Sequence, residues 1–206
     1  MQWYKLDKKQ AEEVIEQVAA SSQAGLFPPG LTEVKMAELP FYRSYKLYRL
    51  INLATLPTFT MDFLSDGKTF IYLDSSKDSL DFIDPEKELR LNEGNVVDYI
   101  NFYYDQVYNE DGDIYIITDP TDLPFMSSLD EAQKDNIMRH HREVDVQLGA
   151  SGAYTIKTTM FYEGGLVEGV IKLDPHTGTP VIMERHMLLN DAVHAYWNQG
   201  YLSWEH

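Results

Sequence analysis

The chain has 206 residues and carries 33 acidic against 17 basic side chains, which gives a formal net charge of −16. Nucleic-acid binding depends on neutralising phosphates, so this charge argues against it, and the same sign disfavours anionic membrane surfaces. A hydrophobic content of 44% predicts a folded, globular chain with a sizeable core. The lack of cysteine excludes disulfides, thiolate metal sites and cysteine nucleophiles.

The chain contains no run of about 20 apolar residues that could cross a bilayer. Its first ten residues include four charged side chains and lack the apolar segment of a secretory signal. We therefore expect a soluble, cytoplasmic protein. Basic residues cluster in two short stretches, one with Arg43, Lys46 and Arg49 and the other at 139–142, and neither is long enough to support nucleic-acid binding.

The N-terminal 40 residues predict a helix followed by a connector. Residues 8–20 have apolar side chains at the spacing of an amphipathic helix, namely Ala11, Val14, Ile15 and Val18. Asp7 and Gln10 form a capping-box-like start. Prolines 28 and 29 cannot lie inside a helix, so residues 21–40 are expected to be a linker that wraps the domain.

From Phe41 the pattern becomes aromatic and β-rich. Strands are predicted at 45–51, 59–63 and 69–73. The pair Asp66-Gly67 predicts a tight hairpin turn between the last two, because such turns need residues with positive φ. The polar stretch 74–88 is expected to be a surface loop.

The second half predicts two more helices and an antiparallel meander. One helix starts at Asn95 and ends near Asn109, and the other follows a capping box at 128–131 and reaches His140. Strands are expected at 114–117, 144–148, 153–162, 166–173 and 181–187.

Because helices and strands cluster instead of alternating regularly, we predict an α+β fold. It should have a largely antiparallel sheet that includes a C-terminal three-stranded meander, with about three helices packed on it. The predicted organisation is an N-terminal helix and linker (1–40), a single α+β domain (41–189) and an aromatic C-terminal tail (190–206).

The histidines and carboxylates give two candidate pairs for a metal or acid–base site. Glu184 and His186 are two apart on a predicted strand and so share a face, where Glu168 of the neighbouring strand could join them. His140 and Glu143 form a second candidate pair at the end of a predicted helix. The simpler interpretation of His140 is a cation that interacts favourably with a helix C-terminus.

An acidic segment runs through the middle of the chain: Asp105, Glu110, Asp111, Asp113, Asp119, Asp122, Asp130, Glu131 and Asp135. It lacks the residue order of a calcium-binding loop. A docking face for a basic partner and a solvated face remain, and the second is the simpler interpretation.

Both ends of the chain are aromatic. These residues are Trp3, Tyr4, Tyr196, Trp197, Tyr201 and Trp204. Tyrosine and tryptophan suit half-buried sheet faces and protein interfaces alike, so the two ends either pack on their own domain or bind a partner.

Scattered motifs across residues 41–189 resemble an uncharacterised family of bacterial, mainly proteobacterial, hypothetical proteins. They include Tyr72-Leu-Asp-Ser75, Asn95-Val-Val-Asp-Tyr99, Asp119-Pro-Thr-Asp-Leu-Pro124, Leu129-Asp-Glu-Ala-Gln133 and the meander. The resemblance implies a shared α+β fold and a soluble protein of bacterial type, and it implies no activity or functional residues.

The sequence shows no convergent nucleophile, base or ligand set and no cofactor motif, so the leading hypothesis is a non-catalytic protein-interaction or assembly module. Such a module would bind a protein partner or self-associate. The alternative is a small-molecule-binding or metal-dependent enzymatic domain with a tyrosine-lined pocket, in which His140, Glu143, Glu184 and His186 carry the chemistry.

Overall fold

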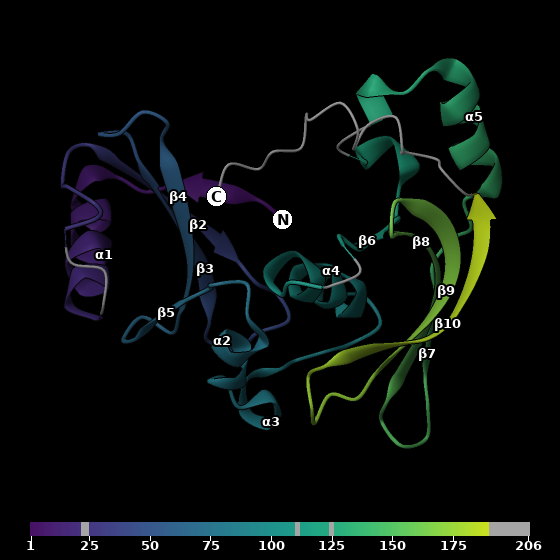
Figure 1. Cartoon of the computed structure of the whole chain (residues 1–206). Helices are drawn as coiled ribbons and strands as arrows, with labels where there is room; N and C mark the ends of the chain where they lie inside the picture. The colour runs from purple at the N-terminus through teal and green to yellow at the C-terminus, as the bar shows by residue number, and fades with distance from the viewer. Residues whose placement is uncertain (22–24, 110–111, 124–125, 190–206) are drawn as a thin grey trace. The chain divides into compact units, whose positions relative to one another are not determined.

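The computed structural model describes residues 1–21, 25–109, 112–123 and 126–189, and these form two compact units that divide after Arg90 (Figure 1). Ten strands and five α-helices lie within the described ranges, and the strands make two separate sheets in which every pairing is antiparallel. The predicted α+β class is therefore confirmed, with two sheets where one was expected.

The first unit contains a sheet whose spatial order follows the chain. Its strands are β1 (Trp3–Lys5), β2 (Thr32–Glu38), β3 (Lys46–Asn52), β4 (Phe59–Ser65) and β5 (Phe70–Tyr72). Strand β2 lies inside the stretch 21–40 that was expected to be a linker. It pairs along its whole length with β3, from Thr32 opposite Asn52 to Glu38 opposite Lys46.

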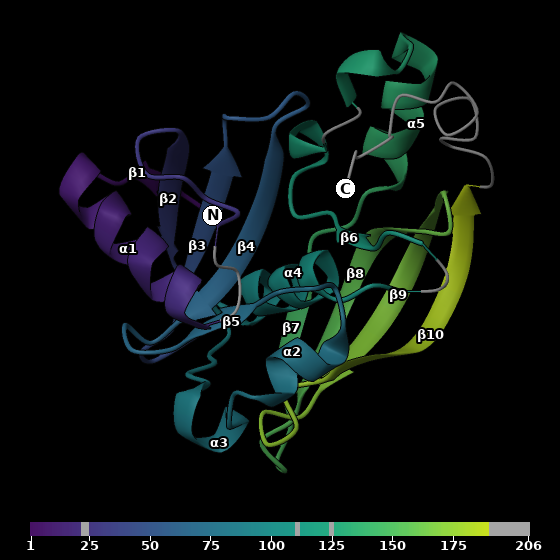
Figure 2. The same cartoon turned by 60° about the vertical axis from the view of Figure 1, so that its left-hand side comes forward.

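Helix α1 (Lys8–Ser21) covers one face of this sheet, as Figures 1 and 2 show. The predicted capping box is present, because the Asp7 carboxylate accepts the backbone N–H of Gln10 and the Gln10 side chain accepts that of Asp7. The apolar side of the helix packs on alternate strand residues in one buried cluster: Val14, Ile15, Val18, Phe27, Val34, Leu50, Phe63 and Phe70. Alternation along the strands then leaves the opposite face of the sheet free of α1.

Strands β4 and β5 form the predicted hairpin. Gly67 has φ of +88°, and the Asp66 carboxylate accepts the backbone N–H groups of Lys68 and Thr69. The expectation of a loop over 74–88 is wrong, since this stretch contains α2 (Lys77–Asp81) and α3 (Pro85–Glu88). Each helix is a single turn or little more, too short for its apolar residues to show a period.

The second unit contains the predicted meander. Its sheet has the order β10 (Pro180–Leu189), β9 (Gly165–Leu173), β8 (Tyr154–Tyr162), β6 (Tyr115–Ile116), and β7 (Asp145–Leu148) also pairs with β8. Glu163 and Gly164 connect β8 to β9 with φ values of +51° and +77°, the positive angles that a two-residue hairpin turn requires.

Two longer helices accompany this sheet. The Tyr99 hydroxyl of α4 (Val96–Gln106) donates to the carbonyl of Gly178, which ties the helix to the β9–β10 turn. Helix α5 (Glu131–His140) packs through Ile137 on Phe161 and Leu166. Its capping box is formed by Asp130 and Gln133, not by the predicted pair at 128 and 131.

None of the helices in the described ranges combines the length and the apolar character needed to span a bilayer.

Candidate functional site

A charged surface occupies the face of the first sheet that points away from α1. Strand register places Lys5, Lys35, Arg49 and Asp62 in one row across β1 to β4, with each residue directly opposite the next. Trp3 and Glu33 lie two residues from members of this row and so share its face. We call these six residues the Arg49 face.

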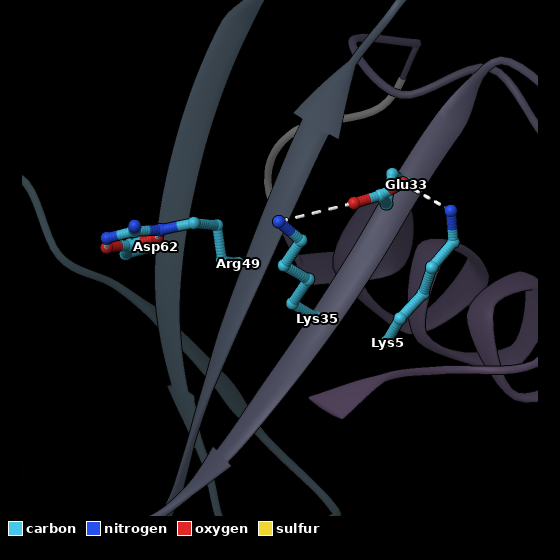
Figure 3. Close-up of polar contacts among 5 residues, drawn as sticks. All are labelled: Lys5, Glu33, Lys35, Arg49 and Asp62. Carbon is cyan, nitrogen blue, oxygen red and sulfur yellow. Dashed lines mark hydrogen bonds and ion pairs between the residues drawn. The ribbon is translucent and has the colours of Figure 1, made fainter. Parts of the chain in front are cut away.

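The centre of this face is a two-point ion pair between β3 and β4. The Nε atom of Arg49 donates to Oδ1 of Asp62 at 2.8 Å, and its Nη2 atom donates to Oδ2 at 2.6 Å (Figure 3). The Asp62 side chain is only 14% exposed. A planar guanidinium held by both oxygens of a carboxylate has a fixed orientation.

Trp3 completes this arrangement from the edge of the sheet. The guanidinium carbon of Arg49 lies 4.7 Å from the centroid of the Trp3 ring, which is within the range of a cation–π contact. Trp3 is opposite Ala37 on β2 and reaches Arg49 on β3. The small side chain of Ala37 leaves room for an indole to extend across the middle strand.

Glu33 joins the remaining cations. Its carboxylate forms ion pairs with Lys5 on β1 and with Lys35 on its own strand, the second at 3.4 Å (Figure 3). The hydrogen bond from Lys5, followed by that from Lys35, lowers the pKa of Glu33 below its usual value. Glu33 therefore remains a fixed negative charge at neutral pH.

The charged row continues into an apolar part of the same face. Ala37, Leu47 and Leu64 follow the row along β2, β3 and β4, and all three are fully buried. This burial anchors the three central strands on the same side as Arg49 and Asp62. The charged side chains of the Arg49 face consequently project from backbone that is held in place by packing.

The structure assigns clear partners to the first basic cluster found in the sequence. Arg49 is paired with Asp62, and Lys46 donates to Glu38 at 2.7 Å. Arg43 is exposed, and its backbone N–H bonds to the carbonyl of Glu88. The cluster is thus divided among several cross-strand contacts and does not form one continuous cationic patch.

The aromatic N-terminus lies in β1. Trp3 belongs to the Arg49 face, whereas Tyr4 points to the opposite side of the strand and is 47% exposed. The other aromatic candidates, Tyr196, Trp197, Tyr201 and Trp204, lie outside the described residues.

The candidate histidines near the end of α5 bond to the backbone. Nδ1 of His140 is 2.8 Å from the carbonyl oxygen of Asn136, and Nε2 of His141 is 3.0 Å from that of Ile117. Glu143 follows on an exposed connection to β7. The geometry of both rings is thus explained by the end of the helix and its attachment to the neighbouring segment.

Glu184 and His186 share one face of β10, and His186 lies directly opposite Glu168 of β9. All three side chains are exposed. Within the described ranges, no three or more His, Asp or Glu side chains are placed to hold one metal ion. His140 and Glu143 are therefore not gathered with Glu184 and His186 into a ligand set.

Several carboxylates of the acidic segment have local structural roles. Asp119 accepts the backbone N–H and the hydroxyl of Thr121 at the start of a 3₁₀ turn, and Asp130 caps α5. Asp113 and Asp105 add their charges to the effect of burial, which raises the pKa of Tyr115 to about 12. For the described members of the segment, these contacts favour the interpretation as a solvated face with local structural roles, and Glu110 and Asp111 lie outside the described residues.

Four members of the Arg49 face were not singled out by the sequence reasoning: Lys5, Glu33, Lys35 and Asp62. The alternation in 59–63 and the β-rich stretch before it indicate two strands. This signal predicts two neighbouring strands, but it does not fix the register that places Arg49 opposite Asp62.

Comparison of the chain with protein-family profiles, with curated proteins and with solved structures found no match.

Proposed function

We propose that the chain is a non-catalytic protein-interaction module that binds a protein partner through the Arg49 face. The observation that carries the proposal is the stack of Trp3, Arg49 and Asp62 at the surface of a rigid sheet. Tryptophan and arginine dominate the residues whose removal weakens protein interfaces most.

Pre-organisation supports the same conclusion. Long charged side chains normally lose rotamer freedom on binding, and this loss opposes association. Arg49 is held on one side by Asp62 and covered on the other by Trp3, and Glu33 holds Lys5 and Lys35. A partner would therefore find these cations already ordered, and the entropic cost of binding would be small.

Local charge also supports a protein partner. The Arg49 face carries three cations and two carboxylates, whereas the whole chain has a net charge of −16. A surface of mixed sign selects a partner with a matching pattern, and it disfavours a bare polyanion, which the rest of the chain repels.

Site-specific photocrosslinking tests the proposal in the cells that produce the chain naturally. Thr60 is exposed and lies two residues from Asp62 on the same face of β4, so a benzoylphenylalanine at position 60 borders the Arg49 face. The matched control carries the same residue at Glu16, which is exposed on α1 on the other side of the sheet.

We expect one predominant crosslinked protein from position 60 that is absent from position 16. The additional substitution Arg49→Ala should reduce this product at least tenfold, while Lys9→Ala on α1 should leave it unchanged. Equal crosslinking from both positions, or a product insensitive to Arg49→Ala, would contradict the proposal.

A further inference from the structure

Strand β10 is the long edge of the second sheet. It has ten residues, whereas the other edge strands of the two sheets, β1, β5, β6 and β7, have two to four. Among the described residues β10 pairs only with β9. Edge strands in natural proteins are usually kept short, because a long row of unpaired backbone groups promotes pairing with another chain.

The side chains of β10 are unusually apolar for an exposed edge. Val181, Met183 and Met187 are between 48% and 58% exposed, although they belong to a strand whose inner neighbour is largely buried. The pairing with β9 is irregular between Ile182 and Glu184 and again between Met187 and Leu189. These irregularities leave a regular central stretch from Glu184 to Met187.

The polar side chains of this central stretch are self-complementary, because a carboxylate and an imidazole alternate around Arg185. We infer that β10 pairs antiparallel with β10 of a second copy of the chain, with the two-fold axis at Arg185. In an isologous pair, residue i of one copy meets residue j of the other and the reverse contact is also made. With Arg185 on the axis, Glu184 of each copy lies opposite His186 of the other, on the same face of the joined sheet.

The neighbouring registers are less favourable. Moving the axis by one residue, to Glu184 or to His186, places two identical groups opposite each other and separates the Glu–His pairs. In the register centred on Arg185, the two Arg185 residues also lie opposite each other, but their guanidinium groups do not need to meet because each one binds within its own chain. Each is 4.2 Å from the ring of Tyr162 in its own chain and 3.6 Å from the Glu163 carboxylate. Met187 at one end of the regular stretch and Met183 just beyond its other end are both exposed, and pairing of the two copies would bury apolar surface there.

Analytical ultracentrifugation of the full chain from micromolar to millimolar concentration tests the inference. We expect a monomer–dimer equilibrium whose upper mass is twice the 23.8 kDa of one chain. Glu184→Lys removes the carboxylate that lies opposite His186 of the other copy and should weaken the dimer roughly tenfold. The double variant Glu184→Lys/His186→Glu exchanges the charges and should restore it.

Lys172→Glu is the matched control, because Lys172 is exposed on β9, one strand away from the edge, and should leave the equilibrium unchanged. Thermal unfolding of each variant checks that the fold is intact. Hydrogen exchange adds a second measurement, and the amides of β10 should become protected as concentration rises.

A chain that is monomeric at every concentration would overturn the inference, and so would a dimer unaffected by Glu184→Lys. Protection of β10 that is independent of concentration would show that the edge is covered within one chain, which also overturns it. The tests of the Arg49 face and of the β10 edge are independent. Arg49→Ala should leave the dimer intact, and Glu184→Lys should leave the crosslink from position 60 unchanged.

Discussion

The guanidinium carbon of Arg49 lies 4.7 Å from the ring centroid of Trp3, although the two residues come from strands that are not adjacent in the sheet. The contact fastens the three-residue strand β1 to β3 across β2. A cation–π contact at a partly exposed site contributes about 0.5–1 kcal/mol. In a double-mutant cycle of Trp3→Ala and Arg49→Ala, we expect a coupling energy of this size, measured by urea unfolding.

A second cycle provides the control. Lys9 is exposed on α1, on the side of the sheet opposite to Trp3, so Lys9→Ala combined with Trp3→Ala should give additive changes in unfolding free energy. If the changes in the Trp3–Arg49 cycle were also additive, the contact between these two side chains would contribute nothing to the free energy of unfolding.

Gly169 on β9 is expected to resist substitution by alanine. A methyl group there would lie 3.2 Å from Sδ of Met160 and still closer to its terminal carbon, and Met160 is completely buried. Overpacking of this kind costs about 1–3 kcal/mol. The companion substitution Met160→Val removes the colliding atoms, so the double variant should be less destabilised than the sum of the two single variants, measured by chemical denaturation.

Asp74 should titrate at unusually low pH. Its carboxylate accepts hydrogen bonds from the hydroxyls of Ser76 and Ser79, each at 2.6 Å, and these lower the pKa of Asp74 to about 2 from 3.8. Because the folded pKa is depressed, the stabilisation is present above pH 3.8 and is lost as the pH falls toward 2. Carboxyl ¹³C NMR should give a midpoint near 2, and Ser79→Ala should raise it, whereas an unchanged midpoint would exclude the Ser79 bond.

Tyr115 should make the free energy of unfolding decrease at alkaline pH. Burial, with the charges of Asp113 and Asp105, raises the pKa of Tyr115 to about 12 from 10.0. The folded chain thus favours the neutral phenol, and the associated stabilisation is complete below pH 10 and lost as the pH rises toward 12. When unfolding by urea is measured between pH 9 and 12, the free energy of unfolding should decline less steeply for Tyr115→Phe than for the wild type. Tyr108→Phe, at an exposed position, should follow the wild type.

The elements that the sequence predicted well are those with a strong local signal. Helix α1 has both a regular apolar spacing and a capping pair, and the meander has turns rich in glycine between alternating strands. Strand β2 was missed for a physical reason. Its charged residues Glu33 and Lys35 suggest a solvated linker, and their place in a sheet becomes evident only through pairing with β1 and β3.

The Arg49 face was less predictable than the fold. Arg49 and Asp62 are thirteen residues apart, and their contact depends on the β3–β4 register, which a single sequence does not specify. Trp3 was identified as an aromatic anchor, but its contact with Arg49 depends on the small size of Ala37 between them. Sites that are assembled across strands in this way require the pairing to be known first.

Strand β1 has a protective role that follows from its position. It pairs with Ala37, Met36 and Lys35 and thereby covers the outer side of β2, a strand more than twice its length. A truncated chain that begins after residue 6 would present that side to other molecules. Such a truncated chain should aggregate through β2 during purification. Because β1 must stay in place, an affinity tag joined rigidly to Met1 is a poorer choice than one attached through a long linker.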